Sequence, residues 1–174
     1  MYGVYNSTKE INYQELPNKF VLKCTHDCGS VIICTNKSKI NKKEVNKKLK
    51  YWLKRNYYYV TREYHYKNIK PRIICEEFIG IKDIPPIDYK FHVFNGEESK
   101  IFIQCDESRF QNHKRSIYDE NWNKLDIQYN KSISPNIIKK PENLDEMIDI
   151  AKKLSEEFED VRVDLYSVGK KIYF

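Results

Sequence analysis

The chain has 174 residues, of which 40% are hydrophobic, and a formal net charge of +6. This length suits one domain, or a compact pair of subdomains, with a real hydrophobic core. No apolar run approaches the roughly 18 residues that a membrane span needs, and the N-terminal segment MYGVYNSTKEINYQ lacks the apolar core and cleavage site of a signal peptide. We therefore expect a cytoplasmic chain without a membrane span.

Basic and acidic residues are mixed along most of the sequence. The densest basic stretch, residues 37–55, is best interpreted as the solvated face of one helix, and no recognised basic-aromatic module accompanies it. We therefore expect no nucleic-acid partner. A modest positive charge suits an anionic small molecule such as a nucleotide equally well.

The five cysteines include no C-x-x-C pair. Four of them, Cys24, Cys34, Cys75 and Cys105, lie in apolar strand-like runs, where a free cysteine usually acts as a small buried hydrophobe. A zinc site is the less favoured alternative. Reduced thiols agree with a cytosolic protein.

Strand and helix periodicities follow one another along the chain, and the Asn-Gly pair at 95–96 predicts a tight hairpin turn. In the first half, the expected elements are strands at 20–24 and 31–35, a helix capped by Asn41 with Glu44 whose apolar face holds Val45, Leu49, Trp52 and Leu53, an aromatic connector at 56–68, and a strand at 72–79. In the second half, they are strands at 89–94, 100–105 and 116–118, a loop-rich stretch at 121–140, a helix announced by Pro141 and Asn143 whose apolar face holds Leu144, Met147, Ile148, Ala151, Leu154 and Phe158, and strands at 161–168 and 171–174. Hairpin connections, instead of regular βαβ crossovers, favour an α+β fold.

Three features are candidates for chemistry, and each has a plain structural alternative. Lys23 precedes a Gly-containing loop whose backbone N–H groups can hold phosphate, although a lysine beside a glycine turn is common. Glu76 and Glu77 end an apolar strand and can line a flat base, or be one solvated and one paired acid. Arg162 and Asp164 share the wet face of a late strand, where an ion pair is the alternative.

The order of these features resembles the ATP-grasp fold. The segments LPNKFVLKCTHDCGSVIIC, KPRIICEEFIG, DYKFHVFNG, YDENW and VRVDLYSVGKKIYF are similar to the TupA-like ATP-grasp proteins of cell-surface polymer and capsule biosynthesis, and they span nearly the whole chain. The resemblance implies two small α+β subdomains, at about 15–79 including the hinge and about 80–174, with mixed or antiparallel sheets and a nucleotide cleft between them.

The resemblance also implies a role for each matching position. Lys23 would contact the α- and β-phosphates of ATP, and Asp88 the ribose hydroxyls. Arg162 would stabilise the transferring phosphate, and Asp164 would hold Mg²⁺. The residues implied for the loop over the triphosphate are His26, Asp27, Cys28, Gly29 and Ser30, and those implied for the adenine hinge are Glu76, Glu77 and Ile79.

The chemistry implied by the superfamily is formation of an acylphosphate from a carboxylate and ATP, followed by attack of an amine or thiol. It asks the protein mostly for positioning and charge neutralisation. The implied cofactors are ATP and Mg²⁺, and the implied substrate is a carboxylate-bearing precursor of a surface polymer, such as a polysaccharide or teichuronopeptide. A non-catalytic nucleotide-binding or interaction module is the alternative.

Two departures from the family pattern bear on activity. Asp27 and Cys28 stand where ATP-grasp loops more often carry Gly and Ser. The pattern also implies truncation at both ends, because the family's last strand continues into a Gly-Glu segment whose acid shares the metal with Asp164. We therefore expect little activity unless a partner chain or another acid, with Asp106 and Glu107 as first candidates, completes the metal site.

Overall fold

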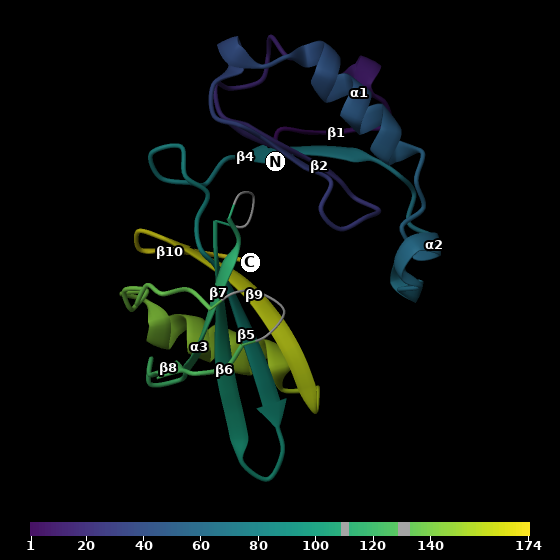
Figure 1. Ribbon diagram of the computed structural model, residues 1–174. Coiled ribbons are helices and arrows are strands. Elements are labelled where there is room, and N and C mark those ends of the chain that lie inside the picture. Colours follow the sequence, from purple (N-terminus) through teal and green to yellow (C-terminus); the bar gives the residue numbers. More distant parts are fainter. Residues whose placement is uncertain (109–111, 129–132) are drawn as a thin grey trace. The chain divides into compact units, whose positions relative to one another are not determined.

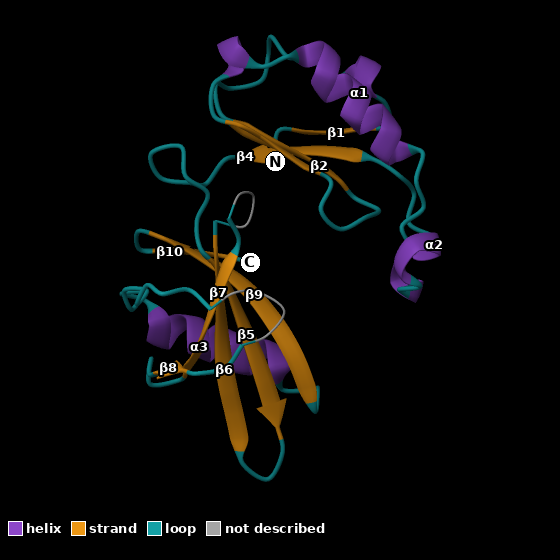
Figure 2. Ribbon diagram, in the orientation of Figure 1, coloured by secondary structure: helices purple, strands orange, loops and turns teal. Residues whose placement is uncertain are grey.

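The structure, a computed structural model, describes residues 1–108, 112–128 and 133–174, and it divides into two units, Met1–Phe78 and Ile79–Phe174. Each unit has one antiparallel sheet, drawn by chain position in Figure 1 and by secondary structure in Figure 2. The described residues of each unit also form a hydrophobic core of their own. The α+β class predicted from the sequence is confirmed.

The first unit is built on a four-stranded sheet in the order β1-β4-β2-β3. Its strands are β1 (Gly3–Tyr5), β2 (Phe20–Cys24), β3 (Val31–Cys34) and β4 (Ile73–Glu77). Strand β1, which pairs with β4, was not predicted, because three residues show too little alternation to identify a strand.

Helix α1 (Lys42–Leu53) packs against the strands in the hydrophobic core of the first unit. It starts as predicted, because the Asn41 side chain accepts a hydrogen bond of 3.1 Å from the backbone N–H of Glu44. Leu49 is fully buried and belongs to the same cluster as Phe20 and Leu22 of β2. One face of the sheet is therefore apolar and covered, and the other carries alternate residues such as Lys23.

The aromatic connector after α1 forms short helices outside the core. The short helices of this unit are η1 (Thr8–Glu10), η2 (Lys37–Lys39), α2 (Tyr58–Thr61) and η3 (Tyr64–Tyr66). Tyr57 and Tyr66 pack edge to face, with ring centroids 5.1 Å apart, whereas Tyr59 and Tyr64 are exposed. The aromatic rings thus pack mainly on one another.

The second unit is built on a six-stranded sheet in the order β10-β9-β5-β6-β7-β8. Its elements are β5 (Asp88–Asn95), β6 (Ser99–Glu107), β7 (Lys114–Asp119), β8 (Lys124–Leu125), α3 (Leu144–Ser155), β9 (Asp160–Val168) and β10 (Lys171–Tyr173). The short β8 lies in the stretch expected to be loop-rich, of which residues 129–132 lie outside the described part.

Residue alternation gives the six-stranded sheet one apolar and one polar face. Phe91 of β5 lies opposite Ile103 of β6 and Val163 of β9, and these side chains share a buried cluster with Met147 and Ala151 of α3. Because side chains alternate along a strand, the residues on either side of them in sequence point to the other face. That second face, which we call the polar face, carries the charged candidates of this unit.

Two details of the second unit differ from the prediction. The loop between β5 and β6 comprises residues 96–98, because Asn95 is still paired with Ser99 in the sheet. The Asn95 side-chain amide does not cap a tight turn. It donates to the carbonyls of Ser155 (2.7 Å), the last residue of α3, and Phe158 (2.9 Å), which follows this helix. Placing Leu154 and Phe158 on the apolar helix face was wrong. Leu154 lies at the edge of the stripe and is 45% exposed, and Phe158 follows the last helical turn and is 53% exposed.

The four cysteines predicted to be buried are buried, and Cys28 is exposed. All five are free thiols, and burial raises the pKa of Cys24 to about 12 and that of Cys75 to about 11. Thiols with such pKa values are poor nucleophiles at neutral pH. Among the described residues, no helix has the length and apolar character to cross a membrane.

Candidate functional site

Lys23 and Glu76 meet on the uncovered face of the first sheet. Antiparallel pairing sets Lys23 of β2 opposite Ile74 of β4, so Glu76 is a diagonal neighbour on the same face. The Lys23 ammonium lies 2.5 Å from a Glu76 carboxylate oxygen, and the two side chains are 40% and 34% exposed. Two residues predicted for different parts of a nucleotide thus lie side by side.

The loop between β2 and β3 is held from inside by a residue that the sequence analysis missed. Arg55 donates from Nη2 to Asp27 Oδ2 (2.8 Å) and to Ser30 Oγ (3.0 Å), and the Ser30 hydroxyl also donates to Asp27. The Asp27 side chain is fully buried. Arg55 follows the end of α1, where the sequence gives no signal for a contact 28 residues back.

The remaining residues of this loop divide between its base and its tip. His26 is 2% exposed, with Nε2 3.1 Å from the Trp52 carbonyl oxygen of α1. Cys28 and Gly29 are exposed, and Gly29 has φ +93°, which glycine adopts without strain. Of the five residues predicted to fold over a triphosphate, the structure therefore exposes only these two at the tip.

The predicted hinge lies where β4 ends. Glu77 is exposed at the last strand position, Phe78 is buried, and Ile79 is half-buried at the first residue of the second unit. The backbone beyond Glu77 makes no further ladder with β2, so its N–H and C=O groups are not used by this sheet.

The polar face of the second unit brings together residues from three neighbouring strands. Lys90 of β5 lies opposite Gln104 of β6 and Asp164 of β9, and in the next row Asp88 of β5 lies opposite Asp106 of β6. Asp88, Lys90, Gln104 and Asp106 are each less than 7% exposed. Buried charges of this kind require partners, and the cross-strand rows provide them.

Lys90 is the centre of this arrangement. Its Nζ forms an ion pair with Asp88 and lies 3.4 Å from Asp164 Oδ2 and 3.9 Å from Asp106 Oδ2. The sequence analysis did not single out Lys90. The segment DYKFHV nevertheless carries the signal, since its two-residue period places Asp88, Lys90 and His92 on one face.

Asp106 is enclosed by donors. It accepts from Arg115 Nε (2.7 Å) and from the Gln104 amide (2.9 Å), and His113 Nε2 lies 3.0 Å away. Burial disfavours its ionised form, but the bonds from Arg115, His113 and Gln104 outweigh burial and hold the pKa of Asp106 below its usual value. Glu107, the other candidate acid, follows in β6 and by alternation belongs to the opposite face.

Arg162 and Asp164 form a two-bond ion pair at the more exposed side of the polar face. Arg162 donates from Nε (2.7 Å) and Nη2 (3.1 Å) to the two carboxylate oxygens of Asp164. Hydrogen bonding to Asp164 raises the pKa of Arg162. The side chains are 53% and 40% exposed, so both can reach a ligand if they exchange this partner.

The donor set at Asp164 fits a magnesium ion that arrives with phosphate. The described residues contain no group of three His, Cys, Asp or Glu side chains arranged to hold a metal ion. Carboxylate oxygens are the donors that Mg²⁺ prefers, and it commonly takes one or two of them together with phosphate and water oxygens. The half-exposed Asp164, with Asp88 and Asp106 behind it, matches that pattern and not a closed protein cage.

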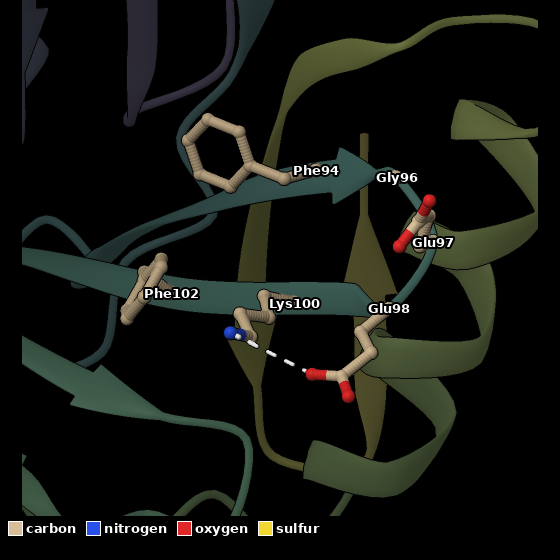
Figure 3. Close-up of a pocket in the computed structure, with 6 residues that line it drawn as sticks. All are labelled: Phe94, Gly96, Glu97, Glu98, Lys100 and Phe102. Atoms are coloured by element: carbon tan, nitrogen blue, oxygen red, sulfur yellow. Dashed lines mark ion pairs between the residues drawn. The ribbon is translucent and has the colours of Figure 1, made fainter.

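A shallow hollow of about 470 Å³ lies at the tip of the β5–β6 hairpin (Figure 3). Its lining consists of Phe94, Gly96, Glu97, Glu98, Lys100 and Phe102. Lys100 and Glu98 form an ion pair of 3.8 Å across its edge. It contains none of the predicted site residues, and its charged side chains are exposed surface groups, so we do not assign the site to it.

The chain was compared with models of protein families, with curated proteins and with solved structures. The sequence model described as TupA-like ATP-grasp matches residues 1–174, which is the whole chain. No curated protein and no solved structure matches the chain.

Proposed function

Because the chain belongs to the TupA-like ATP-grasp family, an ATP-binding and ligase-like class, we propose that it activates a carboxylate with ATP during assembly of a cell-surface polymer. The substrate would be a carboxylate-bearing precursor of a polysaccharide or teichuronopeptide, and the acceptor an amine or thiol. The observation that carries the proposal is the family match over all 174 residues, joined to a cluster of charged residues suited to phosphate chemistry.

In the first unit, we assign Lys23 to the phosphates and the exposed Cys28–Gly29 tip to backbone contacts with them. Lys23 is partly exposed, and its present partner Glu76 is bound through a surface ion pair of small net energy. A nucleotide phosphate can therefore replace it. Glu76, Glu77 and Ile79 are assigned to the base, where the backbone after β4 is not used by the sheet.

In the second unit, Arg162 and Asp164 are assigned to the transferring phosphate and the metal. Asp164 would hold Mg²⁺, and the ion would supply positive charge that neutralises the phosphates. Asp88 was expected at the ribose, but it is 3% exposed and paired with Lys90. That burial favours a role in holding the polar face.

The reaction would proceed in two displacements. A substrate carboxylate oxygen attacks the γ-phosphorus of ATP, the bond to the β-phosphate oxygen breaks, and ADP leaves. An amine then attacks the acyl carbon of the acylphosphate, inorganic phosphate leaves, and the nitrogen loses a proton. The protein supplies no covalent nucleophile. Arg162 would stabilise the charge that develops on the phosphate.

The alternative, a non-catalytic nucleotide-binding module, has one observation in its favour. The Nε and Nη2 groups of Arg162 donate to the two carboxylate oxygens of Asp164, so the two side chains already bind each other. A chain in which this pair persists with ATP present would bind nucleotide without turning it over.

Trapping of the acylphosphate separates the two functions. The full chain is incubated with ATP, Mg²⁺, hydroxylamine and a panel of uronic acids and amino-acid carboxylates, and the hydroxamate and ADP are measured. We expect hydroxamate formation that falls ~10²–10³-fold in Asp164→Asn. The control, Asp160→Asn, changes an exposed acid of the same strand. Nucleotide binding without hydroxamate from any carboxylate would favour the non-catalytic module.

A further inference from the structure

Lys90 occupies the place on the polar face where a cation has the most carboxylate neighbours. Its side chain is 8% exposed, and its ammonium contacts Asp88 and lies within 4 Å of both Asp164 and Asp106. An ammonium group carries three donors and no acceptor. The three aspartates therefore already hold a cation, and this cation belongs to the protein.

Among the described residues, the carboxylates around Lys90 already have cationic partners. The three carboxylates of Asp88, Asp106 and Asp164 are matched by Lys90, Arg115 and Arg162, each of which is bonded to one of them. A divalent ion approaching alone meets carboxylates that already have cations, and it has to displace a buried lysine. That exchange is unfavourable, because the displaced charge loses its partners.

We propose that Lys90 is a resident cation that keeps free divalent ions out of this face, so that the metal enters only together with nucleotide. Lys90 thereby also positions Asp164, since it binds the same Oδ2 to which Arg162 donates through Nη2. The proposal rests on the proposed function for one point, that Asp164 is a metal ligand.

The chemistry of lysine suits this role. Its charge sits at the end of a flexible four-carbon stem, so the ammonium can withdraw from one carboxylate while it keeps another. Metal bound to a triphosphate arrives with a net negative charge, so Lys90 and Arg162 attract the complex, whereas they repel the free ion. The consequence is a metal site whose affinity depends on the nucleotide.

The test measures metal binding with no nucleotide present. Mn²⁺ replaces Mg²⁺, and the free ion is quantified by electron paramagnetic resonance for the full chain and for Lys90→Met. We expect at least ten-fold tighter Mn²⁺ binding by Lys90→Met, with the gain lost in Lys90→Met/Asp164→Asn. Lys90→Arg, which keeps the charge, should bind as weakly as the unchanged chain. Lys100→Met is the control, because Lys100 is 64% exposed.

Three results would overturn the proposal. These are unchanged Mn²⁺ affinity in a folded Lys90→Met, an equal gain in Lys100→Met, or binding by the unchanged chain as tight without nucleotide as with it. If Lys90→Met does not fold, Lys90→Gln serves, because its amide can still donate to Asp88 without a charge. A lack of ATP turnover would refute the proposed function, but the Mn²⁺ binding measurement could still be interpreted, because it is made without nucleotide.

Discussion

At the proposed nucleotide site, the Lys23–Glu76 ion pair is the contact that a phosphate would have to displace. Each partner is about one-third exposed or more, and pairs with that exposure contribute little to stability. The pair therefore holds the two side chains in place without binding them strongly. A ligand that offers phosphate to Lys23 needs to overcome only this small energy, which makes the pair a suitable starting state for nucleotide binding.

His92, on the polar face beside Lys90, should make stability depend on pH. Burial lowers the pKa of His92, and the hydrogen bond with Gln104 (3.3 Å) only partly offsets burial. The unfolded chain then takes up a proton at His92 at a higher pH than the folded chain does. The free energy of unfolding should fall as pH drops below about 6.5, by at most about 1.4 kcal/mol per pH unit and less with solvent screening.

Urea unfolding at several pH values checks this dependence. The variant His92→Gln keeps a hydrogen-bonding group but cannot be protonated, so its unfolding free energy should vary less between pH 7 and 5 than that of the unchanged chain. His65→Gln removes an exposed histidine and should leave the slope as it is. If the unfolding free energies of the unchanged chain and of His92→Gln fall equally between pH 7 and 5, the burial of His92 does not control the loss of stability in acid.

Periodicity identified single residues better than it identified their partners. The alternation in VRVDLY predicts a shared face for Arg162 and Asp164, and the ion pair given as the alternative is present. Lys90 and Asp106 join them only through the register of β5 with β6 and β9. Register depends on long-range pairing, which the local pattern of one strand does not specify.

At the scale of elements, the loop between β2 and β3 is held in one conformation by Arg55. The same cluster contains three buried atoms with no hydrogen-bond partner among the described residues, namely His26 Nδ1, Asp27 Oδ1 and Arg55 Nε. Such atoms reduce the stability of the present arrangement. One cation, Arg55, therefore holds the loop, although some of its buried polar atoms lack hydrogen bonds. This combination suits a segment that rearranges over a ligand.

Arg55→Ala should release this loop. Its loss leaves the buried Asp27 carboxylate without its cation, and we expect a stability loss of about 1–3 kcal/mol with at least ten-fold faster amide exchange in residues 25–31. Hydrogen–deuterium exchange by mass spectrometry measures the effect. Arg62→Ala is the control, since Arg62 is exposed and lies over the Tyr58 ring. Unchanged exchange in Arg55→Ala would mean that the backbone alone holds the loop.

Elements with strong local signals were predicted well, and their ends less well. The start of α1 follows from the Asn41 cap. The strand expected at 116–118 lies within β7, and Tyr118 near its end stacks on Trp122, which follows the strand, with ring centroids 4.3 Å apart. The β5–β6 loop differed from the predicted Asn-Gly turn: Asn95 is the last residue of β5, and its side-chain amide donates to the carbonyl of Ser155 at the end of α3, 60 residues away. A local turn signal cannot register such a distant acceptor.

At the scale of the whole molecule, the described residues form two hydrophobic cores that share no residue. Multidomain chains often unfold in more than one step. Leu49→Ala removes a fully buried side chain from the first core and should cost about 2–5 kcal/mol there.

Exchange of buried strand amides shows where that cost falls. In Leu49→Ala we expect faster exchange in β2 and β4 and unchanged exchange in β5 and β6. Leu154→Ala, which truncates a leucine that is 45% exposed, should change neither set. An equal loss of protection in all four strands would show that the two units unfold as one.

The proposed function requires this chain to bind Mg-ATP through Lys23, and isothermal titration calorimetry measures that binding. We expect one Mg-ATP per chain, with affinity about 10–150-fold weaker in Lys23→Ala, since a hydrogen bond to a charged group is worth about 1.5–3 kcal/mol. Lys48→Ala, which removes a helix-surface lysine paired with Glu44, should bind like the unchanged chain. Absence of binding by the unchanged chain, or equal binding by Lys23→Ala, would refute a nucleotide site at Lys23.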